Sequence, residues 1–266
     1  MPRVFHLLQY GTSTGPFQLF VRDSARSAHG LIRAKTKDMT PDTFDPQQTI
    51  ATVVLDHPAC GRVFQRHRID FCCGGDVSIA TAAAERGIDV DVLVDELSQA
   101  VAGPSPTRHY DPRDLTTSRL VAHIVSTHHE YLRQTLPFVE ALAAKVSDVH
   151  GEHQPELHEL REVVGELSAA LIAHLDEEEN VLFPAISGRT PDLVEAGRHL
   201  GSMIEEHLEV ATLLERIRAI SRDFTLPEWA CTTYRTLFTE LQRVEADTFR
   251  HVHLENHVLR PRFVAA

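Results

Sequence analysis

The chain is poor in cysteine, aromatic residues and basic residues, and it has no long apolar run. Its 266 residues include 26 Lys and Arg against 38 Asp and Glu, which gives a formal net charge of −12. Nucleic-acid binding by phosphate neutralisation needs a basic face, so this charge argues against it. No apolar stretch approaches the roughly 20 residues that span a bilayer, which argues against a membrane protein. A content of 42% hydrophobic and 6% aromatic residues indicates a soluble, globular, helical protein.

The four cysteines, at positions 60, 72, 73 and 231, are too few for a disulfide scaffold in a chain of this length. They also lack the paired C-x2-C spacing of a zinc site. We therefore expect a reducing, cytoplasmic setting. Cys60 and Cys231 are interpreted as small structural residues of the interior. Cys72 and Cys73 are adjacent, and two interpretations stay open: one is a small buried residue and the other incidental, or they form an exposed pair that binds metal, takes part in redox chemistry or exchanges with a partner thiol.

The composition divides the chain. Residues 1–38 hold six Lys and Arg against two acids, and residues 1–44 are interpreted as a disordered extension or as the product of a start codon upstream of Met39, with a targeting peptide as the alternative. Short helical segments then predict a small domain at 45–102, with a Cys-Cys-Gly-Gly turn at 72–75. Residues 103–112 contain two prolines with Gly and Ser and are expected to form a linker.

Four long helical stretches follow, at about 113–147, 154–186, 191–222 and 227–262. Short connections between them favour antiparallel neighbours and thus an up-down-up-down four-helix bundle over residues 113–263. The expected fold class is all-α. An internal repeat supports the bundle: residues 174–184 (HLDEEENVLFP) and 251–261 (HVHLENHVLRP) match as H-x3-E-x2-V-L-x-P.

Histidine is abundant, with 13 of the 17 histidines after Gly103. Residues i and i+4 share one face of a helix, so His174 with Glu178, and His251 with Glu255, each present an imidazole beside a carboxylate. Apolar neighbours indicate that these faces point inward, where an ionised carboxylate is costly unless a cation neutralises it. One such pair alone is more often a solvated surface pair, but two copies on two helices favour a metal site.

The other two helices are expected to contribute as well. The third offers His207, next to Glu205 and Glu206. The first offers His128 and His129, between which periodicity does not decide; we expect His123 to have a supporting role. Six ligands, four imidazoles and two carboxylates, are too many for one tetrahedral zinc and suit two metal ions bridged by carboxylates. Such mixed ligation with open positions is typical of iron and of haemerythrin-like bundles.

Residues 69–75 (IDFCCGG) resemble the signature of the N-terminal domain of the RIC (repair of iron centres) di-iron family. The segments LRQTLP (132–137), EEENVLFP (177–184) and ACTTY (230–234), together with the last H-x3-E-N, occur in the family's order, and the resemblance covers about residues 48–263. By position it implies a set of metal ligands with the two glutamates bridging: His129, His174, Glu178, His207, His251 and Glu255. The last motif has Val-Leu-Arg-Pro where Val-Leu-Phe-Pro is usual, which removes an aromatic contact but no ligand.

The resemblance implies a haemerythrin-like protein with two non-haem iron ions. Its expected function is repair of iron–sulfur clusters damaged by nitrosative or oxidative stress, by donation of ferrous iron, with NO reduction to N2O as an associated activity. NO or O2 would be the small ligands and iron–sulfur proteins the clients, with self-association or client contact through 45–102. The alternatives are an oxygen- or redox-sensing binding protein without turnover, and a bundle with incidental histidines.

Overall fold

The computed structural model describes residues 44–102, 111–188 and 193–263, and helices dominate these ranges. The β pairing found there is one isolated bridge between Thr49 and Ser78. The all-α prediction is confirmed. The predicted extension at 1–44, except its last residue, and most of the predicted linker at 103–112 lie outside the described residues. Within the described ranges, no helix combines the length and apolarity needed to cross a membrane.

Four short α-helices form the region after Phe44: α1 (Ile50–Asp56), α2 (Gly61–Arg66), α3 (Ile79–Arg86) and α4 (Val90–Val101). The side chains of Thr49, Ser78 and Asp89 accept hydrogen bonds from the first-turn amides of α1, α3 and α4, which fixes where these helices begin. Gly87 ends α3 in the left-handed conformation, at φ 66°, which glycine adopts without the strain of a Cβ. Together the helices bury one apolar cluster that includes Phe64, Ile79, Leu93 and Leu97.

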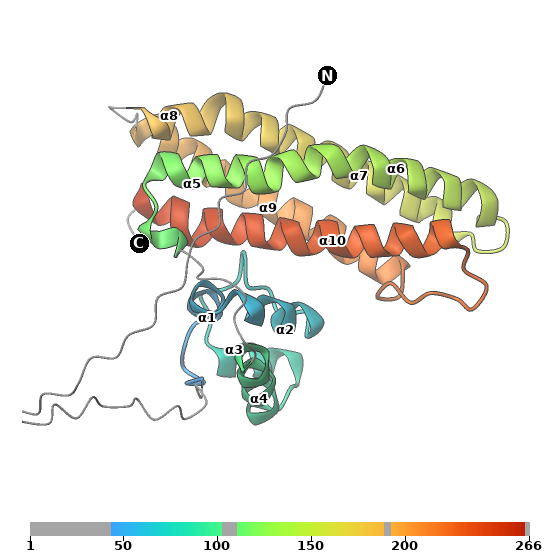
Figure 1. Ribbon diagram of the computed structural model, residues 1–266, viewed down its shortest axis with the longest axis horizontal. Helices are drawn as coiled ribbons and strands as arrows, with labels where there is room; N and C mark the ends of the chain where they lie inside the picture. The colour runs from blue at the N-terminus through green and yellow to red at the C-terminus, as the bar shows by residue number, and fades with distance from the viewer. Residues whose placement is uncertain (1–43, 103–110, 189–192, 264–266) are drawn as a thin grey trace, which may run out of the picture. The chain divides into compact units, whose positions relative to one another are not determined.

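The larger part of the chain is a bundle of long helices (Figure 1). Its elements are α5 (Thr117–Ile124), α6 (Glu130–His150), α7 (Glu156–Glu177), α8 (Phe183–Ser187), α9 (Leu193–Ile220) and α10 (Thr232–Leu254). Helix α6 packs against α7 and α10, and α7 packs against α9. Buried Leu and Val side chains from all four long helices form the core between them, which confirms the predicted bundle.

Three π-helical segments interrupt this regular pattern, at Val125–His129, Glu178–Leu182 and Glu255–Leu259. They join α5 to α6, join α7 to α8 and extend α10. Helical periodicity predicts uninterrupted α-helices here, and the π turns correct that prediction. The fourth stretch also begins later than predicted, at Thr232 instead of 227.

The small helical region is anchored on α10. The ring of Phe71 makes edge contacts with the rings of Phe249 and His253, at centroid distances of 5.9 Å and 5.6 Å. Val252 of α10 is buried in the same apolar cluster as the small helices. The Cys-Cys-Gly-Gly turn is therefore held against the end of α10 that leads into the third π segment.

Candidate metal centre

The six residues predicted from the sequence as metal ligands lie together in the interior of the bundle. Each is at most 4% exposed; they are His129, His174, Glu178, His207, His251 and Glu255. Three of them stand at π segments: His129 ends the first, and Glu178 and Glu255 open the second and third. Because π turns occur frequently at functional sites, their placement here supports the centre of the bundle as a candidate site.

The donor atoms form two overlapping groups in which all atoms lie within 4.8 Å of one another. One group contains His129 and His251, the other His174 and His207, and both contain Glu178 and Glu255. Two sets of imidazoles that share two carboxylates are the arrangement expected for two cations bridged by those carboxylates.

Three of the four imidazoles are oriented by an acceptor on a different segment of the chain. Nδ1–H of His129 donates to Glu179 at 2.9 Å, and that of His174 donates to Glu206 at 2.7 Å. Nδ1 of His207 lies 3.3 Å from the side-chain oxygen of Asn256. Since the proton is on Nδ1, the Nε2 lone pair of each ring faces the interior, as metal ligation requires.

The inward-facing atoms fit cations. Nε2 of His129 lies 3.1 Å from Nε2 of His251, and Nε2 of His207 lies 3.2 Å from Nε2 of His174. Both oxygens of Glu178 are buried without a hydrogen bond, although Oε2 is 3.3 Å from Nε2 of His129. Opposed lone pairs and buried carboxylates without donors are unfavourable unless positive charge lies between them. The chemistry of the donor set is therefore that of a metal site.

Without metal, protons provide this charge. Burial acts to lower the pKa of His251, but Glu255 and Glu178 outweigh it and raise the pKa to about 10. Burial acts to raise the pKa of Glu255, but His251 and His207 hold it well below its usual range. Metal ions would displace the histidine protons, so metal uptake here would be coupled to proton release.

His128, the residue that periodicity does not separate from His129, is buried beside the site. Its Nδ1 lies 3.0 Å from Asp247, and its ring stacks on that of His251 at 5.6 Å and 5°. His123 lies one ring further out, 6.1 Å from His128, with its Nδ1 3.1 Å from the Thr127 hydroxyl. The structure thus places His129 in the donor groups and His128 on their flank.

The Cys-Cys-Gly-Gly turn contacts the segment that carries Glu255. The Asp70 carboxylate accepts hydrogen bonds from the amides of Cys72 and Cys73, both at 2.9 Å, and of Gly74 at 3.0 Å, which folds the turn. The Cys72 carbonyl accepts from the side-chain amide of Asn256 at 2.9 Å. Asn256 therefore connects the turn to His207 of the candidate metal centre.

The cysteines agree only in part with the expectations for them. Cys72 is buried and Cys73 is half-buried, so they do not form an exposed pair, and the alternative of one small buried residue fits Cys72. A hydrogen bond with Cys73, burial and the Asp70 charge raise the pKa of the Cys72 thiol well above its usual value. Cys60 is buried as expected, but Cys231 is exposed just before α10 and is not a residue of the interior. A loop position before a helix, rather than a helical face, explains this exposure.

Helical spacing does not identify Glu179, Glu206 or Asn256 as the groups that orient the histidines. Each belongs to a different segment of the chain from the ring it holds, so helical spacing carries no signal for the pairing. The replacement of phenylalanine by arginine in the last Val-Leu-x-Pro motif removes an aromatic contact. Phe183 of the first copy stacks on His129 at 5.6 Å, and its counterpart in the second copy is Arg260.

Comparisons with known proteins agree with this geometry. The Hemerythrin HHE cation binding domain matches residues 120–263, and a domain of unknown function (DUF542, ScdA_N) matches residues 46–101. The iron–sulfur cluster repair protein ScdA of Staphylococcus haemolyticus is 30% identical over 220 residues, which cover 82% of this chain and 98% of the relative. The iron–sulfur cluster repair protein YtfE of Yersinia pseudotuberculosis is 34% identical over 218 residues, 81% of this chain and 96% of the relative. The chain therefore belongs to the family of iron–sulfur cluster repair proteins and carries a haemerythrin-type cation-binding domain.

Proposed function

We propose that this protein repairs iron–sulfur clusters damaged by nitrosative or oxidative stress, and that it does so as a di-iron protein that donates ferrous iron. The observation that carries the proposal is the pair of overlapping donor groups that share Glu178 and Glu255. The names of the relatives supply the repair activity. The proposed ligands are His129, His174, Glu178, His207, His251 and Glu255, with the two glutamates bridging.

The residues divide the work as follows. The four imidazoles would be neutral ligands, so the two glutamates would compensate only part of the charge of two divalent ions and would leave the site with a net positive charge. Glu179 and Glu206 compensate part of this charge from outside while they orient His129 and His174. Bound ferrous ions would supply electrons and open coordination positions, which suits release of iron to a client and reduction of two NO, with two electrons and two protons, to N2O and water. We propose a cytoplasmic location and iron–sulfur proteins as clients.

The metal part of the proposal is tested by iron quantification and Mössbauer spectroscopy after anaerobic purification. We expect about two irons per chain with a coupled spectrum in the wild type, because bridging carboxylates hold the ions close. Glu178→Ala removes one bridge and is expected to deplete the site. Glu162→Ala, an exposed glutamate on the same helix α7, is the matched control and is expected to keep full iron. Far less than two irons in the wild type would contradict the di-iron assignment.

The repair part needs a separate assay. Iron-loaded protein is incubated with an enzyme whose iron–sulfur cluster has been nitrosylated, and recovered enzyme activity is measured. The control is an equal amount of free ferrous iron. Recovery no greater than that of free iron would contradict repair by this protein, whatever the metal content proves to be.

A further inference from the structure

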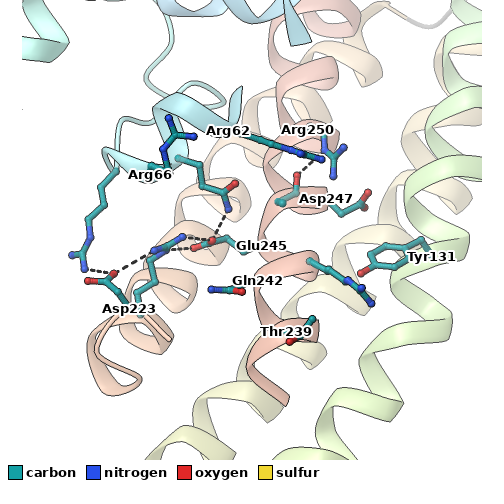
Figure 2. A pocket seen from close by; sticks show the side chains of 14 residues that line it. Arg62, Arg66, Tyr131, Asp223, Thr239, Gln242, Glu245, Asp247 and Arg250 are labelled. Atoms are coloured by element: carbon teal, nitrogen blue, oxygen red, sulfur yellow. Dashed lines mark hydrogen bonds and ion pairs between the residues drawn. The ribbon is translucent and has the colours of Figure 1, made fainter. Parts of the chain in front are cut away.

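A large cleft opens where the small helical region meets the bundle (Figure 2), with a volume of about 980 Å³. Its lining includes six arginines against three acidic residues: Arg62, Arg66, Arg68, Arg218, Arg243 and Arg250 against Asp223, Glu245 and Asp247. We call it the arginine cleft. In a chain of net charge −12 this is a local reversal of sign, and a concentration of like charge in one hollow needs a physical explanation.

Two of the six arginines, Arg68 and Arg218, form ion pairs that hold the structure together. Arg218 donates to the buried carboxylate of Glu245 at 2.6 Å, and Gln65 of the small region donates to the same carboxylate at 2.6 Å. Arg68 pairs with Asp223, which also accepts from Arg218. These ion pairs join the small region to the bundle and leave the two central guanidinium groups neutralised.

The arginines at the rim of the cleft are exposed, unlike the ion pair of Arg218 with buried Glu245. Among the described residues, neither Arg62 nor Arg250 has an acidic partner; Nε of Arg250 donates to the Ala246 carbonyl of its own helix at 2.9 Å. Arg66 and Arg243 pair with glutamates outside the cleft but remain 62% and 64% exposed. The rim therefore presents exposed guanidinium groups from α2 and from α10 to one hollow, where an external anion would relieve their mutual repulsion.

We propose that the arginine cleft is a docking site for an acidic segment of a protein partner. Exposed arginines on two separate walls are typical of protein interfaces, in which Arg is enriched and steers an oppositely charged partner. The exposed neutral side chains of Thr239 and Gln242 also line the cleft and provide further hydrogen-bonding groups.

A partner that binds in the arginine cleft would lie close to the proposed metal centre. Asp247 lines the cleft and lies 3.0 Å from His128, whose ring stacks on that of His251. A partner bound in the cleft is thus separated from the metal centre by two side chains. This step rests on the proposed function, because only a client or redox partner of the metal centre would gain from that proximity.

The test measures binding of a fluorescein-labelled peptide of ten glutamates by fluorescence anisotropy at low salt, with metal-free and iron-loaded protein. We expect the double variant Arg62→Gln/Arg250→Gln to bind at least about tenfold more weakly than the wild type, since two charge-assisted contacts are lost. The matched control is Arg119→Gln/Arg235→Gln, which removes two exposed arginines outside the cleft. The control is expected to bind within about twofold of the wild type.

Equal weakening by the two double variants would overturn the proposal, because binding would then reflect overall charge. Tight binding of inorganic pyrophosphate that displaces the peptide and depends on Arg62 and Arg250 would overturn it in favour of a small phosphate ligand. Both variants keep all six proposed metal ligands, and the peptide assay does not need iron. A failure of the proposed function would therefore leave peptide binding intact, whereas a failure of the docking proposal would leave iron content intact.

Discussion

Substitution of Glu245 tests which contacts hold the small helical region on the bundle. The Glu245 side chain is 1% exposed and accepts from Gln65 on one side and from Arg218 on the other. Glu245→Ala would leave a guanidinium that is 18% exposed and a glutamine without their common acceptor. Removal of one partner of a buried pair costs about 3–5 kcal/mol. Arg218 keeps Asp223 at 3.2 Å, so we expect the lower end, about 3 kcal/mol.

The assay is urea denaturation of the metal-free protein, followed by circular dichroism. The control is Glu166→Ala, which removes an exposed carboxylate 2.8 Å from Arg216 and is expected to cost less than about 1 kcal/mol. If the two variants lost equal stability, the buried carboxylate would not be an important link between the two parts. If Glu245→Ala lowered the stability only of a first unfolding transition, at low urea, and left the unfolding of the bundle unchanged, the effect would lie at the contact between the small helical region and the bundle.

Three further outcomes follow from local geometry. Gly75→Ala should destabilise by about 1–3 kcal/mol, because a Cβ there would lie 2.6 Å from the Phe71 carbonyl and 2.9 Å from the Cβ of Ala51. Gly165→Ala in α7 meets nothing within 4 Å and should stabilise by up to about 1 kcal/mol; the same urea titration measures both. Cys231 is exposed and should react with iodoacetamide in the native protein, whereas burial raises the pKa of Cys60 to about 12 and should protect it until unfolding, as peptide mass spectrometry would show. Alkylation of Cys60 at the rate of Cys231 would contradict this.

The helical faces of the bundle were predictable because apolar and ligand residues recur at helical spacing. Glu178 and Glu255 stand four residues after His174 and His251, and all four are buried as that spacing predicts. The choice between His128 and His129 was not predictable from spacing alone. Both lie in a π turn, which widens the helix by one residue per turn, and both are buried.

Contacts between segments that are distant in the sequence could not be predicted from the helical spacing of residues. Asn256 follows a proposed ligand directly, yet its side chain reaches His207 of α9 and the carbonyl of Cys72. The six arginines of the arginine cleft are spread from Arg62 to Arg250 and converge only because the small helical region lies against α9 and α10. Such pairings depend on how helices pack, which no local pattern encodes.

The internal repeat shows how much a short motif encodes when it is repeated. Both copies place the last α-helical residue before a glutamate and continue as a five-residue π segment, Glu178–Leu182 and Glu255–Leu259. Two copies that share a sequence also share an unusual backbone, so the motif specifies the π turn as well as the ligands. A π turn is less favourable than an α turn and persists only where the surroundings stabilise it. Here each of these two π segments opens on a glutamate of the donor groups, so the cations that these groups are suited to hold would stabilise the two turns.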